Sequence, residues 1–125
     1  MSKTNALKEI IHRNTSSIVD DCFYRIADEE KAYRYAVYDI ESSDLGDIHR
    51  DDLILIIDLW DKGTDTSWIE DAADQIEALF NAANLPNEYI LPTFYRISRR
   101  NVPDEDKSLI HRQLKFRIEN YDLEV

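Results

Sequence analysis

The chain has few of the residues that build disulfides, flexible linkers or membrane spans. Its 125 residues include one cysteine, two glycines and three prolines. Because Cys22 has no second cysteine to pair with, we expect a reducing compartment such as the cytoplasm. The longest apolar run, Leu53 to Ile57, is far shorter than the roughly 20 residues of a membrane helix. We therefore expect a single domain, residues 1–125, with no membrane association.

Positive charge is also scarce. Against 26 Asp and Glu there are 15 Lys and Arg, which gives a net charge of −11. Residues 66–92 contain five acids and no Lys or Arg, whereas residues 93–125 contain seven basic and six acidic groups. Such a negative field repels phosphate, so we expect no specific binding of nucleic acid. The asymmetry lets an acidic face of one copy meet a basic face of another, although a solvated acidic surface is the simpler interpretation.

Arrangements of residues that carry chemistry are missing as well. His12, His49 and His111 have no second ligand at a metal-binding spacing. The acidic run at 104–106 lacks the alternating ligands and the glycine of a calcium loop, so we interpret it as a turn. Cys22 is interpreted as a buried small thiol. The sequence thus predicts no catalytic residue, no metal and no cofactor, and we expect the chain not to be an enzyme.

The pattern of apolar residues predicts two helices and five strands. The helices are expected at residues 3–13 and at about 67–84. The resulting order, α-β-β-β-α-β-β, predicts an α+β fold. We expect a mainly antiparallel sheet with the long helix and the short N-terminal helix packed on it. The expected strands are residues 22–26, 33–40, 50–60, 93–102 and 109–121.

The strand at 50–60 is apolar on both of its faces, which indicates that both faces are covered. One cover is the helix at 67–84, and the other is a second layer or another subunit. Asp58 interrupts the second face, so that face is not purely a core face. The first face holds Leu53, Leu55, Ile57 and Leu59, and the second holds Ile54, Ile56 and Trp60.

The helix at 67–84 combines an apolar stripe with four acidic residues. Ser67 and Glu70 fit a capping box, and Asn84 with Pro86 is expected to end the helix. We expect the acids to lie on the exposed surface, so Glu77→Lys should leave folding almost unchanged. The stripe consists of Ile69, Ala72, Ala73, Ile76, Phe80 and Ala83, and the acids are Glu70, Asp71, Asp74 and Glu77.

Several segments together resemble the tail terminator proteins of long-tailed bacteriophages, which are also called tail completion, head–tail joining or minor tail proteins. The most characteristic segment is Asp58-Leu59-Trp60-Asp61-Lys62, which is followed by a polar turn and an amphipathic helix. An N-terminal helix at 6–12 precedes it, and an acidic turn at 103–106 leads into a final strand at 110–118. The glycines typical of the family after the helix are replaced here by residues 85–89.

The resemblance implies a structural virion protein. Such proteins assemble as a ring, usually of six copies, that caps the tail tube and joins it to the head connector while DNA passes through without specific binding. The implied partners are further copies of the chain, the major tail tube protein and the head connector. The implied location is the head–tail junction of the virion, and the host cytoplasm during assembly.

Interface residues are expected among the tryptophans, the arginines and the charged groups. Tyrosine, tryptophan and arginine are favoured at the energetic centres of protein interfaces, although packing in the core is the alternative for each aromatic residue. A second hypothesis is a small acidic immunity or antitoxin protein that binds and blocks a basic nuclease toxin. The candidate residues for an oligomer, tail or connector interface are Asp58, Trp60, Trp68, Glu77, Arg99 and Arg100.

Overall fold

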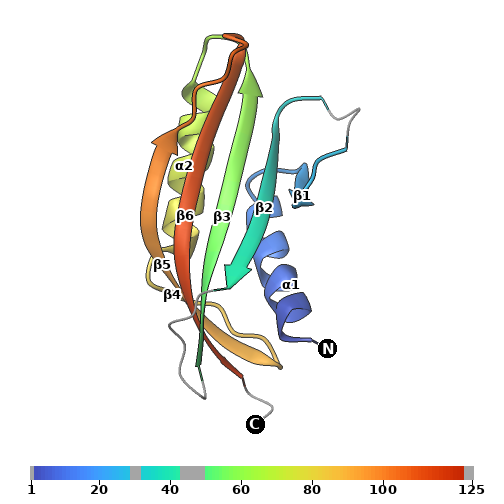
Figure 1. Cartoon of the computed structure of the whole chain (residues 1–125), viewed down its shortest axis with the longest axis vertical. Coiled ribbons are helices and arrows are strands. Elements are labelled where there is room, and N and C mark those ends of the chain that lie inside the picture. The colour runs from blue at the N-terminus through green and yellow to red at the C-terminus, as the bar shows by residue number, and fades with distance from the viewer. Residues whose placement is uncertain (1, 29–31, 43–49, 123–125) are drawn as a thin grey trace.

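The computed structural model describes residues 2–28, 32–42 and 50–122. They form a six-stranded sheet with two helices on one of its faces (Figure 1). This is the α+β fold predicted from the sequence. The elements are α1 (Lys3–Ser16), β1 (Cys22–Tyr24), β2 (Tyr35–Ser42), β3 (Arg50–Lys62), α2 (Ser67–Phe80), β4 (Ala83–Asn84), β5 (Ile90–Asn101) and β6 (Leu109–Asp122).

The sheet is antiparallel except at one edge. Its strand order is β1-β2-β3-β6-β5-β4, and β1 pairs with β2 in the parallel direction. The two longest strands, β3 and β6, lie side by side at the centre and pair from Arg50 opposite Tyr121 to Lys62 opposite Leu109. Because neighbouring residues of a strand point to opposite sides, this register fixes which side chains share each face.

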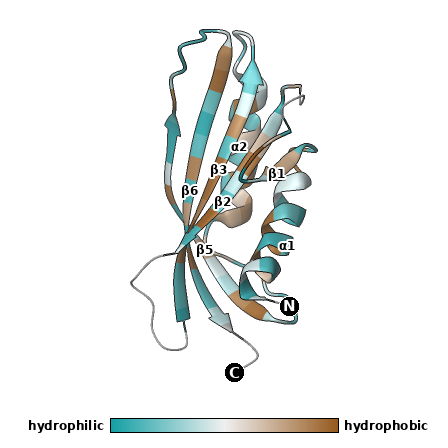
Figure 2. Cartoon of the chain, turned by 45° about the vertical axis from the view of Figure 1, so that its right-hand side comes forward, coloured by the Kyte–Doolittle hydropathy of each residue, from teal (hydrophilic) through white to brown (hydrophobic). Residues whose placement is uncertain are grey.

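The core lies between the sheet and the two helices. Its centre is a group of three rings: Phe80 of α2 lies 4.9 Å from Phe94 and 5.5 Å from Phe116, measured between ring centroids. All three side chains are fully buried, and burial of each contributes roughly 1.5–3 kcal/mol. Alternating hydrophobic and hydrophilic residues along β6 (Figure 2), and alternating burial along β3, follow from this one-sided cover.

The first helix is longer than the sequence predicts. It continues through the polar residues 14–16 to Ser16, because the side chain of Asn14 donates to the carbonyl of Ile10 and Thr15 is buried. The hydroxyl of Ser2 accepts the backbone N–H of Asn5 and caps the helix.

The second helix begins as expected but without the predicted capping box. Thr66 makes no side-chain cap, and the carboxylate of Asp65 accepts the N–H of Ser67 at 2.9 Å instead. The side chain of Glu70 does not cap the helix, since its carboxylate accepts a hydrogen bond from Arg112 of β6 at 2.7 Å. An ion pair within the fold therefore replaces the local motif.

The predicted end of this helix at Asn84 is wrong. The helix stops at Phe80, Asn81 is extended, and Ala82 has a left-handed φ of 50°. This turn places Ala83 and Asn84 opposite Phe94 and Thr93 as the short edge strand β4. Pairing with the sheet thus overrides helix propensity in this segment.

Smaller differences concern the strand limits. The first strand ends at Tyr24, because Arg25 has a φ of 70°, and the second spans Tyr35–Ser42 instead of residues 33–40. The β5 strand begins at Ile90, ahead of Pro92. Residues 29–31 and 43–49, which include His49, lie outside the described residues. Neither described helix has the length and apolar character of a membrane span.

Candidate interaction surface

The side of the sheet opposite the helices, here called the open face, has no helix or strand packed on it in the part of the chain that the structure describes. Leu55, Ile57 and Leu59 point to the core and are fully buried, whereas Ile54 and Ile56 point to the open face and stay partly exposed. The two-sided apolar pattern of β3 is confirmed, and within residues 2–28, 32–42 and 50–122 only one of its two expected covers is present.

A row of rings crosses the open face near the C-terminal end of β3, at Trp60. The indole of Trp60 stacks on the imidazole of His111 with centroids 3.9 Å apart and planes 16° apart. On its other side Tyr35 lies 6.5 Å away, followed by Tyr33 at 5.4 Å from Tyr35, while Phe23 meets Tyr35 edge-on at 6.2 Å. The row links β1, β2, β3 and β6 and forms a partly exposed aromatic surface.

Polar groups continue this row toward β5. His111 Nε2 lies 2.6 Å from Asp58 Oδ1, and the amide of Gln113 donates to the same oxygen at 3.1 Å. The guanidinium of Arg100 donates in turn to Gln113 Oε1 at 3.1 Å. The structure therefore brings Asp58, Trp60 and Arg100 together on the open face, through two residues that the sequence interpretation did not select.

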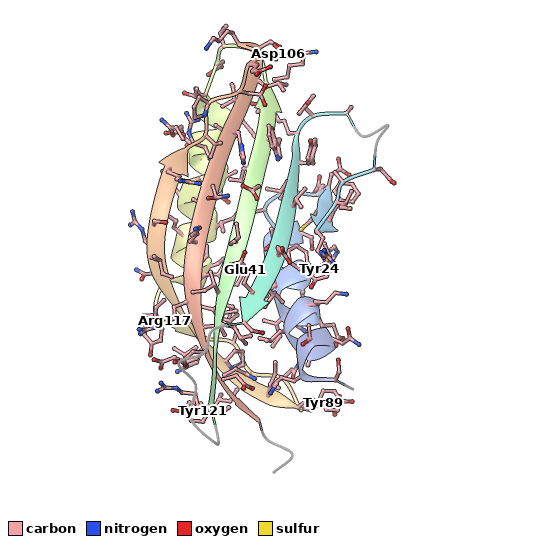
Figure 3. All side chains as sticks on the ribbon, in the orientation of Figure 1. Tyr24, Glu41, Tyr89, Asp106, Arg117 and Tyr121 are labelled. Atoms are coloured by element: carbon pink, nitrogen blue, oxygen red, sulfur yellow. The ribbon has the colours of Figure 1, made fainter. Side chains whose placement is uncertain are left out.

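Around Ile54 and Ile56, nearer the start of β3, the charged side chains of the open face differ in sign from one neighbouring strand to the other. Ile56 lies in register between Asp39 of β2 and Lys115 of β6. Ile54 lies between Glu41 and Arg117, which Figure 3 labels on either side of β3. The open face thus has an acidic column on β2 (Asp39 and Glu41), an apolar column on β3 (Ile54 and Ile56) and a basic column on β6 (Lys115 and Arg117). The basic column ends at Glu119, whose carboxylate lies 3.4 Å from the guanidinium of Arg117.

The other candidate residues lie on the helix side of the sheet. Arg99 donates to Glu77 Oε1 at 2.9 Å and to Asp74 Oδ1 at 2.6 Å, and Arg96 forms a second ion pair with Glu77. Burial alone would lower the pKa of Arg99, but its hydrogen bonds to Asp74 and Glu77 raise it above the ordinary value. These ion pairs fasten α2 to β5.

The expected surface position of Glu77 is wrong. Its side chain is only 9% exposed, because Arg96 and Arg99 cover it from β5. Trp68 is partly buried against the core, and the guanidinium of Arg34 lies 4.9 Å above its ring. Trp68, Glu77 and Arg99 therefore belong to a different side of the molecule from Asp58, Trp60 and Arg100.

Cys22 is buried, in agreement with its interpretation as a small core thiol. Desolvation raises its pKa to about 12, so the reactive thiolate is not populated at neutral pH. Burial likewise raises the pKa of the neighbouring Tyr38 to about 12. Within residues 2–28, 32–42 and 50–122, no three His, Cys, Asp or Glu side chains gather as metal ligands would.

Comparisons with known proteins give a likeness of fold. No protein-family model and no curated protein matches the sequence. A chain in a structure described as the virion of a native gene transfer agent particle superposes with a TM-score of 0.74 at 13% identity, over 94% of this chain and 96% of that one. A second solved structure, whose description names no activity, gives 0.73 at 10% identity over 96% of both chains. The fold is therefore one that a virion particle contains.

Proposed function

We propose that the chain is a structural component of a virion that works through shape and self-association, without catalysis. The observation that carries the proposal is the likeness, over nearly the whole of both chains, to a chain of a gene transfer agent virion. Support comes from the open face, where apolar and aromatic side chains remain partly exposed on a rigid sheet. Partly exposed aromatic residues with polar neighbours are typical of protein interfaces.

More specifically, we propose that the chain lies at the junction of head and tail. We expect a ring of six copies that caps the tail tube, contacts the tube protein on one side and the head connector on the other, and lets DNA pass. The strand, turn and helix at residues 58–80 support this role through their resemblance to tail terminators. The net charge of −11 is compatible with a lumen that does not hold DNA.

A growth assay of tail tubes tests this role. Tube protein of the particle that encodes the chain is polymerised with and without the chain, and tube length and joining to DNA-filled heads are scored by electron microscopy. We expect capped tubes of limited length that join heads only when the chain is present. Tubes that grow and join equally without it would contradict the role.

A further inference from the structure

We infer that neighbouring copies in the ring associate front to back, with the open face of one copy on the helix side of the next. This inference rests on the proposed self-association and specifies its two contact surfaces. The open face presents its acidic column on β2, its apolar column on β3 and its basic column on β6. The helix side presents the matching features in the same lateral order: a basic helix, an apolar hollow and an acidic helix.

The first helix lies behind the acidic column and has the opposite charge. The imidazole of His12 lies 6.1 Å from the ring of Tyr38 in β2, and Lys8 Nζ lies 4.2 Å from the ring centre of Tyr24 in β1. These contacts place α1 on the helix side of β1 and β2. The helix carries three basic residues and one acidic residue, and Arg13 is exposed.

The second helix lies behind the basic column and is acidic. Its hydrogen bonds to β5 and β6, such as that between Glu70 and Arg112, place it there. The helix has four acids and no Lys or Arg. Asp71, Asp74, Gln75 and Ala78 follow one another at helical spacing on its exposed side. Asp71 therefore faces away from the sheet, toward any copy that approaches from behind, whereas the exposed Asp74 is also paired with Arg99 of β5.

An apolar hollow separates the two helices. It has a volume of ≈ 400 Å³ and is lined by Ser17 and Ile18 after α1 and by Gln75, Ala78 and Leu79 of α2. The hollow lies between the basic and the acidic helix, as the apolar column lies between the acidic and the basic column. When the open face of one copy meets the helix side of another, the two isoleucines approach the hollow and each charged column approaches a helix of opposite sign.

The positions of these surfaces determine the symmetry of the contact. Because they lie on opposite sides of one two-layer domain, a contact between them is head-to-tail and leaves both surfaces available on the outer copies. Such heterologous contacts continue from copy to copy and close into a ring when the rotation allows it. Two copies joined through their open faces would instead form a closed dimer that cannot add further copies.

Charge reversal on each surface tests the inference. The front variant combines Lys115→Glu with Arg117→Glu, and the back variant combines Asp71→Lys with Gln75→Lys, which leaves the Arg99 ion pairs intact. Lys107→Glu and Glu105→Lys, at an exposed turn, are the matched controls. We expect each double variant to reduce the ring fraction on tail tubes, counted by electron microscopy, about tenfold or more, since like charges then face each other.

Mixing the variants distinguishes front-to-back contacts from other contacts. Equal amounts of the front and back variants should restore rings, since the reversed front of one fits the reversed back of the other, and one chain with all four substitutions should also restore them. Thermal melting checks that each variant is folded. Normal rings from the back variant, or no recovery in the mixture although both variants are folded, would overturn the inference and leave the proposed ring intact.

Cross-linking provides a second readout that does not depend on charge. The unreactive buried thiol of Cys22 allows Lys115→Cys and Asp71→Cys to be introduced into the natural chain. The double variant should give ladders longer than two copies under oxidation, and each single variant should stay uncross-linked. Dimers from Lys115→Cys alone would overturn the front-to-back contact, and a parent chain that never self-associates would overturn the proposed function as well.

Discussion

Trp60 and His111 stack on the open face with their ring centroids 3.9 Å apart. The two residues are far apart in the chain and meet because β3 and β6 pair in a register that sets them opposite each other. Asp58 contacts the imidazole on the same face. This contact joins the aromatic row to the polar groups of β6.

The first prediction concerns that contact. Trp60→Ala removes the stacking on His111 and Tyr35 and should lower the free energy of unfolding by about 2 kcal/mol, because the ring is partly buried. Urea denaturation measures the change. Ile26→Ala, at a residue that is 78% exposed, should stay within about 0.5 kcal/mol of the parent. Equal midpoints for both variants would show that the stacking does not stabilise the domain.

The second prediction replaces the sequence-based expectation for Glu77. Glu77→Lys places a third positive charge beside Arg96 and Arg99 at a nearly buried position, and should cost about 3 kcal/mol of unfolding free energy. Asp71→Lys, which introduces the same charge change earlier in α2 on its exposed side, should cost less than about 0.5 kcal/mol. If the two variants have the same melting temperature, the ion pairs of Glu77 contribute little to stability.

The third prediction tests the buried face of α2. Ile76 is fully buried against the sheet, so Ile76→Asp should bury an unpaired charge and unfold the domain, as seen in circular dichroism at room temperature. The adjacent Gln75→Asp, on the exposed side, should melt near the parent temperature. A folded Ile76→Asp variant would mean that this side of the helix is not in the core.

The fourth prediction concerns the stability of the domain in acid. Hydrogen bonds from the side chain and backbone of Ser67 lower the pKa of Asp65 in the folded state. Their contribution is therefore complete above the ordinary pKa of aspartate, about 3.9, and is lost as the pH falls through the lower folded value. Asp65→Asn should flatten the fall of melting temperature below about pH 4. An unchanged slope in Asp65→Asn would contradict this linkage.

Much of the fold could be predicted because its signals are local. The apolar run of β3, the alternation in β6 and the stripe of α2 are local patterns, with periods of about two residues in β6 and 3.6 in α2, and these elements begin where the sequence places them. The end of α2 could not be predicted, since β4 forms only when Ala83 and Asn84 meet β5. The parallel pairing of β1 likewise depends on contacts far apart in the chain.

The candidate surface could be predicted only in part. Asp58 and Trp60 stand out within the strand itself, but His111 and Gln113 join them through the register of β3 with β6, which no local pattern specifies. Glu77 is expected on the surface from sequence because an acid in an amphipathic helix usually faces water. The arginines that cover it come from β5, and their positions follow from the packing of that strand beside α2.

The central claim is that the chain functions by associating with itself. The most direct measurement is native mass spectrometry of the purified chain in the presence of tail tubes of its own particle, combined with negative-stain images of the tube ends. We predict a closed ring of six copies on each capped end. A chain that remains monomeric on the tubes, or that instead forms one tight complex with a basic nuclease, would contradict the claim.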